Sequence, residues 1–99
     1  MSGDVQFDKP YTYRGTKTIQ VSKFYPRWGW HVSVLEIERW AGEKTWRVVR
    51  PQKSAAWNVR GEIVIPAKPR LVFAEGLTLP QARQKALEVL EQTPLEDLL

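Results

Sequence analysis

The chain has 99 residues, no cysteine, one histidine and a formal net charge of +4 at pH 7. This length suits one domain with one core. The absence of cysteine excludes a disulfide framework, a zinc–thiolate site and a cysteine nucleophile. No apolar run approaches the roughly 20 residues that cross a bilayer, and the polar start of the chain lacks the blocks of a signal peptide, so we expect a cytoplasmic protein without membrane contact.

Charged and aromatic residues are unevenly distributed along the chain. Residues 1–60 contain eleven Lys or Arg and five Asp or Glu, whereas residues 76–99 contain two basic and four acidic residues. Ten of the eleven aromatic residues also lie at or before Trp57. Basic charge interleaved with aromatic rings is typical of surfaces that bind single-stranded nucleic acid. The alternative is an ordinary charged surface around a core built from the aromatic side chains.

The chain begins with a segment of weak pattern and continues into a strand. Residues 1–15 contain scattered glycine, proline and aromatic residues, and we expect a lead-in arm with an extended piece at 11–14. In residues 16–25, Ile19 and Val21 alternate with polar residues, which is the period of a half-buried strand. The following Pro-Arg-Trp-Gly at 26–29 predicts a turn.

Residues 30–40 predict the longest strand, in which the apolar residues change face. Val32 and Val34 share one face, then Leu35 and Ile37 occupy the other, which indicates a bulge or a stretch buried on both faces. A connection with glycine at 41–43 predicts a hairpin to a third strand at 44–50. We interpret residues 51–60, which are polar and basic without strong periodicity, as a loop.

The last part of the chain predicts short strands and then a helix. A short apolar strand is expected at 62–65, and two prolines separate it from apolar residues 71–73, which can resume the pairing. Thr78 and Gln81 have the spacing of a capping box, and Pro80 falls in the first helical turn. Apolar residues then recur at helical spacing, so we predict a helix over 78–92 and a short tail over 93–99.

Strands followed by one helix predict an α+β fold in a single domain. We expect an antiparallel sheet of about four strands within residues 16–73, followed by one C-terminal helix packed on one face. One helix covers only one face of a sheet. The other face must therefore meet solvent, a partner subunit or a ligand.

The sequence contains no recognisable catalytic set, so we do not expect an enzyme. His31 has no serine in a G-x-S-x-G turn, and the glycines stand singly, so a phosphate loop is absent. Glu36 and Glu38 share a strand face, as paired acids or metal ligands would. Neighbouring basic residues such as Arg39 favour cross-strand ion pairs instead. We expect neither a metal nor a cofactor.

Two clusters of aromatic and basic residues support a binding function. They lie at the first hairpin (23–30) and around the second hairpin (39–50), and the loop that follows extends them. Lys and Arg attract phosphates, and aromatic rings stack on unpaired bases, worth about 1–3 kcal/mol per base. We predict a module that holds single-stranded DNA or RNA on a basic, Trp-rich sheet surface. The predicted binding residues are Lys17, Lys23, Phe24, Tyr25, Arg27, Trp28, Arg39, Trp40, Arg47, Arg50, Lys53, Trp57 and Arg60.

Some of the five tryptophans are needed for the core. Alternation places Trp30 on the face of Val32 and Trp46 on the face of Val48, so both are predicted to face the core. Trp28, Trp40 and Trp57 lie at turns, strand ends or loops and are expected to be exposed. Exposed tryptophans imply a partner, and Trp, Tyr and Arg also dominate protein hot spots. The alternative function is therefore a small regulatory module that docks on a larger protein through the same surface.

Two segments, 18–24 (TIQVSKF) and 31–40 (HVSVLEIERW), resemble the first two strands of the positive-cofactor-four and whirly-like single-stranded-DNA-binding proteins. The order of strands and then a helix at 79–92 also fits. This resemblance implies a four-stranded sheet, a homodimer formed through the helix, and a role in transcription regulation through DNA held on the sheet. The positions that carry over are Lys23, Phe24, Arg39 and Trp40. The Pro-rich stretch 51–70 and the helix sequence depart from that family.

Overall fold

Alternating apolar residues build the centre of the fold, which is a hairpin of two ten-residue strands. In the computed structural model, which describes residues 4–27 and 29–98, β3 (Thr16–Tyr25) pairs antiparallel with β4 (Trp30–Arg39). Val21 lies opposite Leu35 and Ser22 lies opposite Ser33, so Val34 is an extra residue in β4. The predicted change of face is therefore a β-bulge, and it buries both Val34 and Leu35.

The main sheet has six strands within the described residues. Its order is β1-β3-β4-β5-β8, and β2 also pairs with β3. The additional strands are β1 (Val5–Phe7), β2 (Tyr11–Tyr13), β5 (Trp46–Arg50) and β8 (Leu71–Leu77), all in antiparallel pairs. The predicted lead-in contributes β1 and β2, and the extended piece expected at 11–14 corresponds to β2. The sheet is thus wider than the four strands expected, because two short pieces of the lead-in add to β3.

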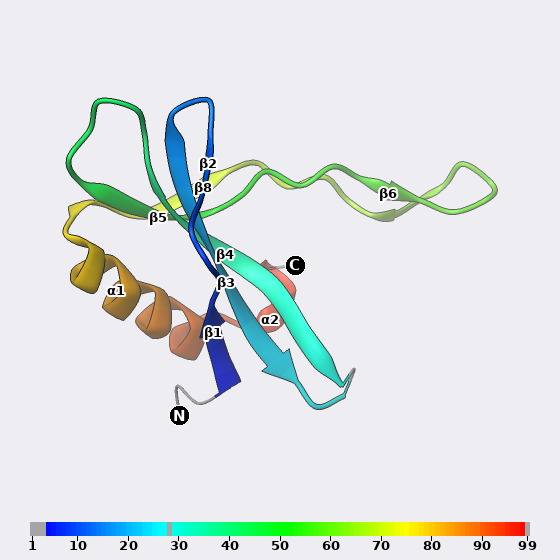
Figure 1. The fold of residues 1–99 in the computed structure, drawn as a ribbon. Helices are drawn as coiled ribbons and strands as arrows, with labels where there is room; N and C mark the ends of the chain where they lie inside the picture. Colours follow the sequence, from blue (N-terminus) through cyan, green and yellow to red (C-terminus); the bar gives the residue numbers. More distant parts are fainter. Residues whose placement is uncertain (1–3, 28, 99) are drawn as a thin grey trace.

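Residues 51–70, here called the arm, project from the main sheet as a two-stranded ribbon (Figure 1). β6 (Ala56–Trp57) pairs antiparallel with β7 (Ile63–Ile65), and an isolated bridge joins Lys53 to Lys68 closer to the main sheet. The prediction of a loop at 51–60 is therefore wrong, because this segment pairs with the residues that follow it. The strand predicted at 62–65 exists, but it belongs to the arm and not to the main sheet.

The helix prediction is confirmed together with its capping box. α1 (Leu79–Gln92) begins after Thr78, whose Oγ1 accepts the N–H of Gln81 at 3.4 Å, while the Gln81 Oε1 accepts the N–H of Thr78 at 3.0 Å. These two bonds satisfy donors that the first helical turn leaves without partners. The predicted tail contains α2 (Leu95–Leu98). Across the described residues, neither helix has the length and apolar character needed to span a membrane.

Helix α1 covers one face of the main sheet, as expected for the α+β class (Figure 1). Side chains from β3, β4 and β5 form a buried core with its apolar stripe: Ile19, Val21, Leu35, Ile37, Val48, Ala82, Ala86, Val89 and Leu90. Burial of a Val, Leu or Ile side chain stabilises a fold by about 1.5–3 kcal/mol. This interface therefore supplies most of the apolar stabilisation and holds the opposite face of the sheet in place.

Of the two tryptophans predicted to face the core, one is buried and the other is exposed. Trp46 is 7% exposed and belongs to the core, as predicted. Trp30 is 62% exposed, so its predicted burial is wrong. Trp30 pairs with Tyr25 at the end of the β3–β4 hairpin, which extends beyond α1 (Figure 1). Strand alternation gives the face of a side chain but not whether the helix reaches that far along the strand.

Candidate nucleic-acid interface

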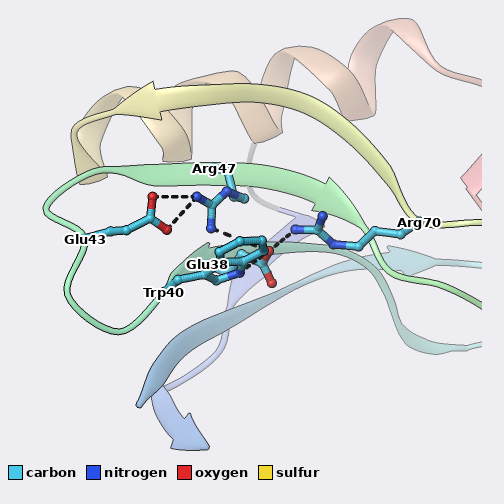
Figure 2. Close-up of polar contacts among 5 residues, drawn as sticks. All are labelled: Glu38, Trp40, Glu43, Arg47 and Arg70. Carbon is cyan, nitrogen blue, oxygen red and sulfur yellow. Dashed lines mark hydrogen bonds and ion pairs between the residues drawn. The ribbon is translucent and has the colours of Figure 1, made fainter. Parts of the chain in front are cut away.

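Five residues from three parts of the chain meet on the sheet face opposite α1 (Figure 2). Glu38 lies directly opposite Arg47 in the β4–β5 ladder, and opposed residues of an antiparallel pair share a face. Trp40 follows two residues after Glu38 and lies on the same side. Glu43 reaches in from the hairpin turn and Arg70 from the end of the arm. We call Glu38, Trp40, Glu43, Arg47 and Arg70 the Glu38 network.

Carboxylates neutralise the two arginines of the Glu38 network. The Nη2 of Arg47 donates to both carboxylate oxygens of Glu43, at 2.7 and 2.9 Å, and its Nη1 lies 3.9 Å from the Glu38 Oε1. Arg70 donates to the same Glu38 oxygen, which also accepts the indole N–H of Trp40 at 3.0 Å. Glu38 and Arg47 are both buried. Removing one member of such a buried network leaves the remaining charges with fewer partners, which destabilises a fold.

The ring of Trp40 is partly covered by the arginines of the same network. The Arg47 Cζ lies 4.1 Å from the centroid of the ring and the Arg70 Cζ lies 5.5 Å from it, both within cation–π range. Trp40 nevertheless remains 47% exposed, which agrees with its predicted exposure. A ligand can therefore reach part of the indole ring. It would meet Arg47, however, as a buried and neutralised cation that is poorly suited to bind phosphate.

Glu36 extends this face toward the hairpin end, away from Trp40. Burial raises the pKa of the Glu36 carboxyl above its ordinary value, and the nearby charge of Glu38 raises it further. A hydrogen bond from Gln20 and the charge of Arg70 act in the opposite direction. The two carboxylates expected to share a face do so, and Glu38 makes the ion pairs that the sequence predicted for this strand.

The structure divides the other predicted binding residues between the two faces of the sheet and the arm. Register places Lys17, Lys23, Tyr25, Arg39 and Arg50 on the face that carries α1. Among these, Arg39 lies over the ring of Trp46, with its Cζ 5.2 Å from the centroid. Phe24 lies on the opposite face beside His31, and Arg27 is exposed at the hairpin turn. Trp28 lies outside the described residues.

Lys53, Trp57 and Arg60 all lie on the arm, with Lys53 at its base and the other two toward its tip. Trp57 is 61% exposed, as predicted, and Arg60 is exposed in the turn. Asn58 closes that turn: its Oδ1 accepts the N–H groups of Arg60 and Glu62 at 2.9 and 3.0 Å. Gly61 supplies the positive φ of 78° that the turn requires. The tip therefore presents an indole ring and a guanidinium on an ordered hairpin.

Lys68 and Arg70 were not among the binding residues predicted from the sequence, although both lie next to residues that were. Lys68 pairs with Lys53 across the arm, and Arg70 contacts Glu38 and Trp40. The turn at 58–61, with asparagine first and glycine last, is a hairpin signal between Trp57 and the apolar run 63–65. Recognising that hairpin would have placed residues 66–70 opposite the basic segment 50–54.

The described part of the chain contains no pocket and no group of three side chains able to hold a metal ion. Comparison of the chain with models of protein families, with curated proteins and with solved structures finds no match. The candidate site therefore rests on the geometry of the arm and the Glu38 network.

Proposed function

We propose that this protein is a nucleic-acid-binding module whose arm is the main contact element. The observation that carries the proposal is the exposure of Trp57 on a projecting ribbon that is rich in cations (Figure 1). The arm contains Lys53, Arg60 and Lys68 in addition to Arg70, which Glu38 neutralises, and its one carboxylate is Glu62. Cations attract the phosphate backbone, and an exposed indole ring stacks on a base.

Single-stranded DNA or RNA is the favoured ligand because unpaired bases expose the ring faces on which an indole stacks. Trp57 on the arm and the exposed part of Trp40 at the root of the arm both offer such a surface. A strand that follows the arm would pass basic groups along its length. A two-stranded ribbon also fits the major groove of a duplex, so duplex binding is the competing outcome of the test.

The test is a fluorescence titration of the intact protein with a mixed single strand of about 20 nucleotides and with the matching duplex, at low and moderate salt. We expect saturable quenching that weakens steeply with salt and favours the single strand. Trp57→Ala should remove most of the affinity. Trp30→Ala is the matched control, because Trp30 is 62% exposed and Trp57 is 61% exposed, but Trp30 lies on the hairpin and not on the arm. A flat titration at low salt with folded protein would refute the proposal.

A second function is favoured by the exposed apolar residues of β7 and the neighbouring turn. Ile63, Val64 and Ile65 are all exposed, and Val59 projects from the turn. Contiguous exposed apolar side chains mark surfaces that bind proteins. The alternative is therefore a regulatory module that docks on a larger protein through β7. In that case an Ile63→Thr/Ile65→Thr variant loses its partner in pull-down experiments, and oligonucleotides leave the tryptophan fluorescence unchanged.

A further inference from the structure

The β2–β3 hairpin places two tyrosines on the sheet face that carries the Glu38 network. Tyr11 in β2 lies opposite Thr18 in β3, and Thr18 in turn lies opposite Glu38 in β4. Opposed residues of an antiparallel pair share a face. Tyr13 follows two residues after Tyr11 and therefore lies on the same side of the strand. This face thus carries Tyr11 and Tyr13 in addition to Trp40.

The two tyrosines of β2 are not part of the buried core. Tyr11 is 46% exposed and Tyr13 is 64% exposed, compared with 47% for Trp40. Their rings are therefore open to solvent on a strand that the sheet holds in place by pairing with β3. Exposed aromatic side chains that gather on one face mark a surface that binds a partner.

The turn between β2 and β3 holds an arginine in an unfavourable backbone conformation. Two-residue hairpin turns of this kind need a positive φ at both central positions, and they favour Asn-Gly for that reason. Here Arg14 has a φ of 52° and Gly15 a φ of 82°. Glycine adopts such a φ without steric cost, whereas arginine strains the backbone. Strain of this kind is often associated with function.

The guanidinium of Arg14 is exposed beside the ring of Tyr13. Its Cζ lies 5.2 Å from the centroid of that ring, and no carboxylate of residues 4–27 and 29–98 forms an ion pair with it. The turn also approaches the β4–β5 connection. A Cβ atom at Gly15 would lie 2.8 Å from the Cβ of Ala41, the residue that follows Trp40. The hairpin therefore brings an unneutralised cation to the end of the sheet where Trp40 lies.

We propose that the β2–β3 hairpin is a second contact element for a bound single strand. Tyr11 and Tyr13 stack on unpaired bases, and Arg14 binds a phosphate of the backbone. This assignment of the ligand rests on the proposed function, in which the arm makes the main contact. The hairpin then makes a weaker contact further along the same strand. The nearby Glu38 does not repel that strand, because its own network neutralises it.

The first experiment measures, by fluorescence anisotropy, the affinity of the intact protein for a labelled mixed single strand of about 20 nucleotides. Tyr11→Val and Tyr13→Val should each weaken binding about fivefold, the lower end of what one stacked base contributes. Valine keeps the strand propensity of β2, so the variants should remain folded. Thr12→Val is the matched control, because Thr12 lies on the opposite side of the same strand, and it should leave the affinity unchanged.

A second variant, Arg14→Asn, separates a role in binding from a role in the fold. Asparagine is favoured at this position of the turn, so the variant should unfold at a temperature at least as high as the parent protein. It should nevertheless bind the single strand more weakly. The slope of log affinity against log salt should fall by about 0.7, the value of one phosphate contact in a single strand. A lower unfolding midpoint with an unchanged slope would overturn the role of Arg14 in binding.

The outcomes for the hairpin and for the arm are distinguishable. If Trp57→Ala weakens binding while the tyrosine variants and Arg14→Asn bind like the parent protein, the hairpin contact is overturned and the proposed function stands. If the tyrosine variants weaken binding and Trp57→Ala does not, the hairpin contact stands and the arm is not the main contact. If the folded protein binds no oligonucleotide at low salt, both proposals are overturned, and the tyrosine face is left as a surface for a protein partner.

Discussion

The Glu38 network and the arm use the same residue types in opposite ways. In the network, the indole of Trp40 lies against Arg47, and the arginine charges are matched by Glu38 and Glu43. In the arm, Trp57 is mostly exposed and the cations outnumber the single carboxylate. Groups that are buried and neutralised by one another serve the fold. Exposed rings beside unneutralised charge are instead available to bind a ligand. Aromatic and basic residues therefore indicate a binding surface only where they are not already paired with other groups of the same protein.

The largest expected effect follows from removing the charge of Glu38, because this carboxylate serves two arginines and an indole. Glu38→Gln should destabilise the protein by about 3 kcal/mol, since it removes a buried charge that faces both Arg47 and Arg70, while Glu43 still pairs with Arg47. Urea unfolding followed by circular dichroism measures this change. The matched arm variant, Trp57→Ala, should alter stability by no more than about 0.5 kcal/mol. Equal losses in the two variants would contradict the division between a structural network and a binding arm.

The second prediction concerns the affinity for a single strand, for which the arm should matter more than the Glu38 network. Trp57→Ala should weaken binding of a single strand by about 2 kcal/mol, or roughly thirtyfold, because a full stacking surface is lost. Trp40→Ala should weaken it by less, because arginines already cover part of the indole ring of Trp40. Fluorescence anisotropy of a labelled strand gives both values. A larger loss for Trp40 than for Trp57 would place the binding surface on the sheet.

A smaller effect is expected from the contact between Trp40 and Arg47, and the question is whether this contact contributes to the free energy of unfolding. A double-mutant cycle with Trp40→Leu and Arg47→Met should give a coupling energy of about 0.5–1 kcal/mol, as expected for a partly exposed cation–π pair. The four proteins are compared by urea unfolding. Additive losses would show that Arg47 is held by Glu43 and Glu38 alone and that the ring contact contributes nothing.

The smallest effect is a pH dependence that arises from Glu36. Its pKa is raised in the folded protein by burial and by Glu38, so the folded state keeps the proton to a higher pH than the unfolded state does. Stability contributed by this group is therefore present below the ordinary glutamate pKa of about 4.5 and is lost as pH rises through the raised value. Glu36→Gln should flatten the profile of unfolding midpoint against pH in that range and raise the midpoint at neutral pH. Identical profiles would show that Glu36 is not coupled to folding.

Local features explain why parts of the fold were predictable. The capping box at Thr78 and Gln81 depends on groups three residues apart, so the start of α1 could be placed from the sequence. Alternation along β3 and the change of face at Val34 and Leu35 likewise report the burial of neighbouring side chains, and both were correct. The arm was missed because its pairing joins Lys53 to Lys68 across a turn and leaves no apolar periodicity in residues 51–60.

The α+β class, the helix with its cap, and the concentration of basic and aromatic residues before residue 61 could all be inferred from the sequence. These properties follow from short-range patterns of polarity and capping, which survive without knowledge of distant partners. Three features emerge only when the chain is folded: Arg47 is buried between two carboxylates, Trp30 extends beyond α1, and Lys68 lies opposite Lys53. Each of these features depends on which residues distant in the sequence come together. Such contacts, and not the composition, decide whether a side chain is buried and whether its charge is neutralised.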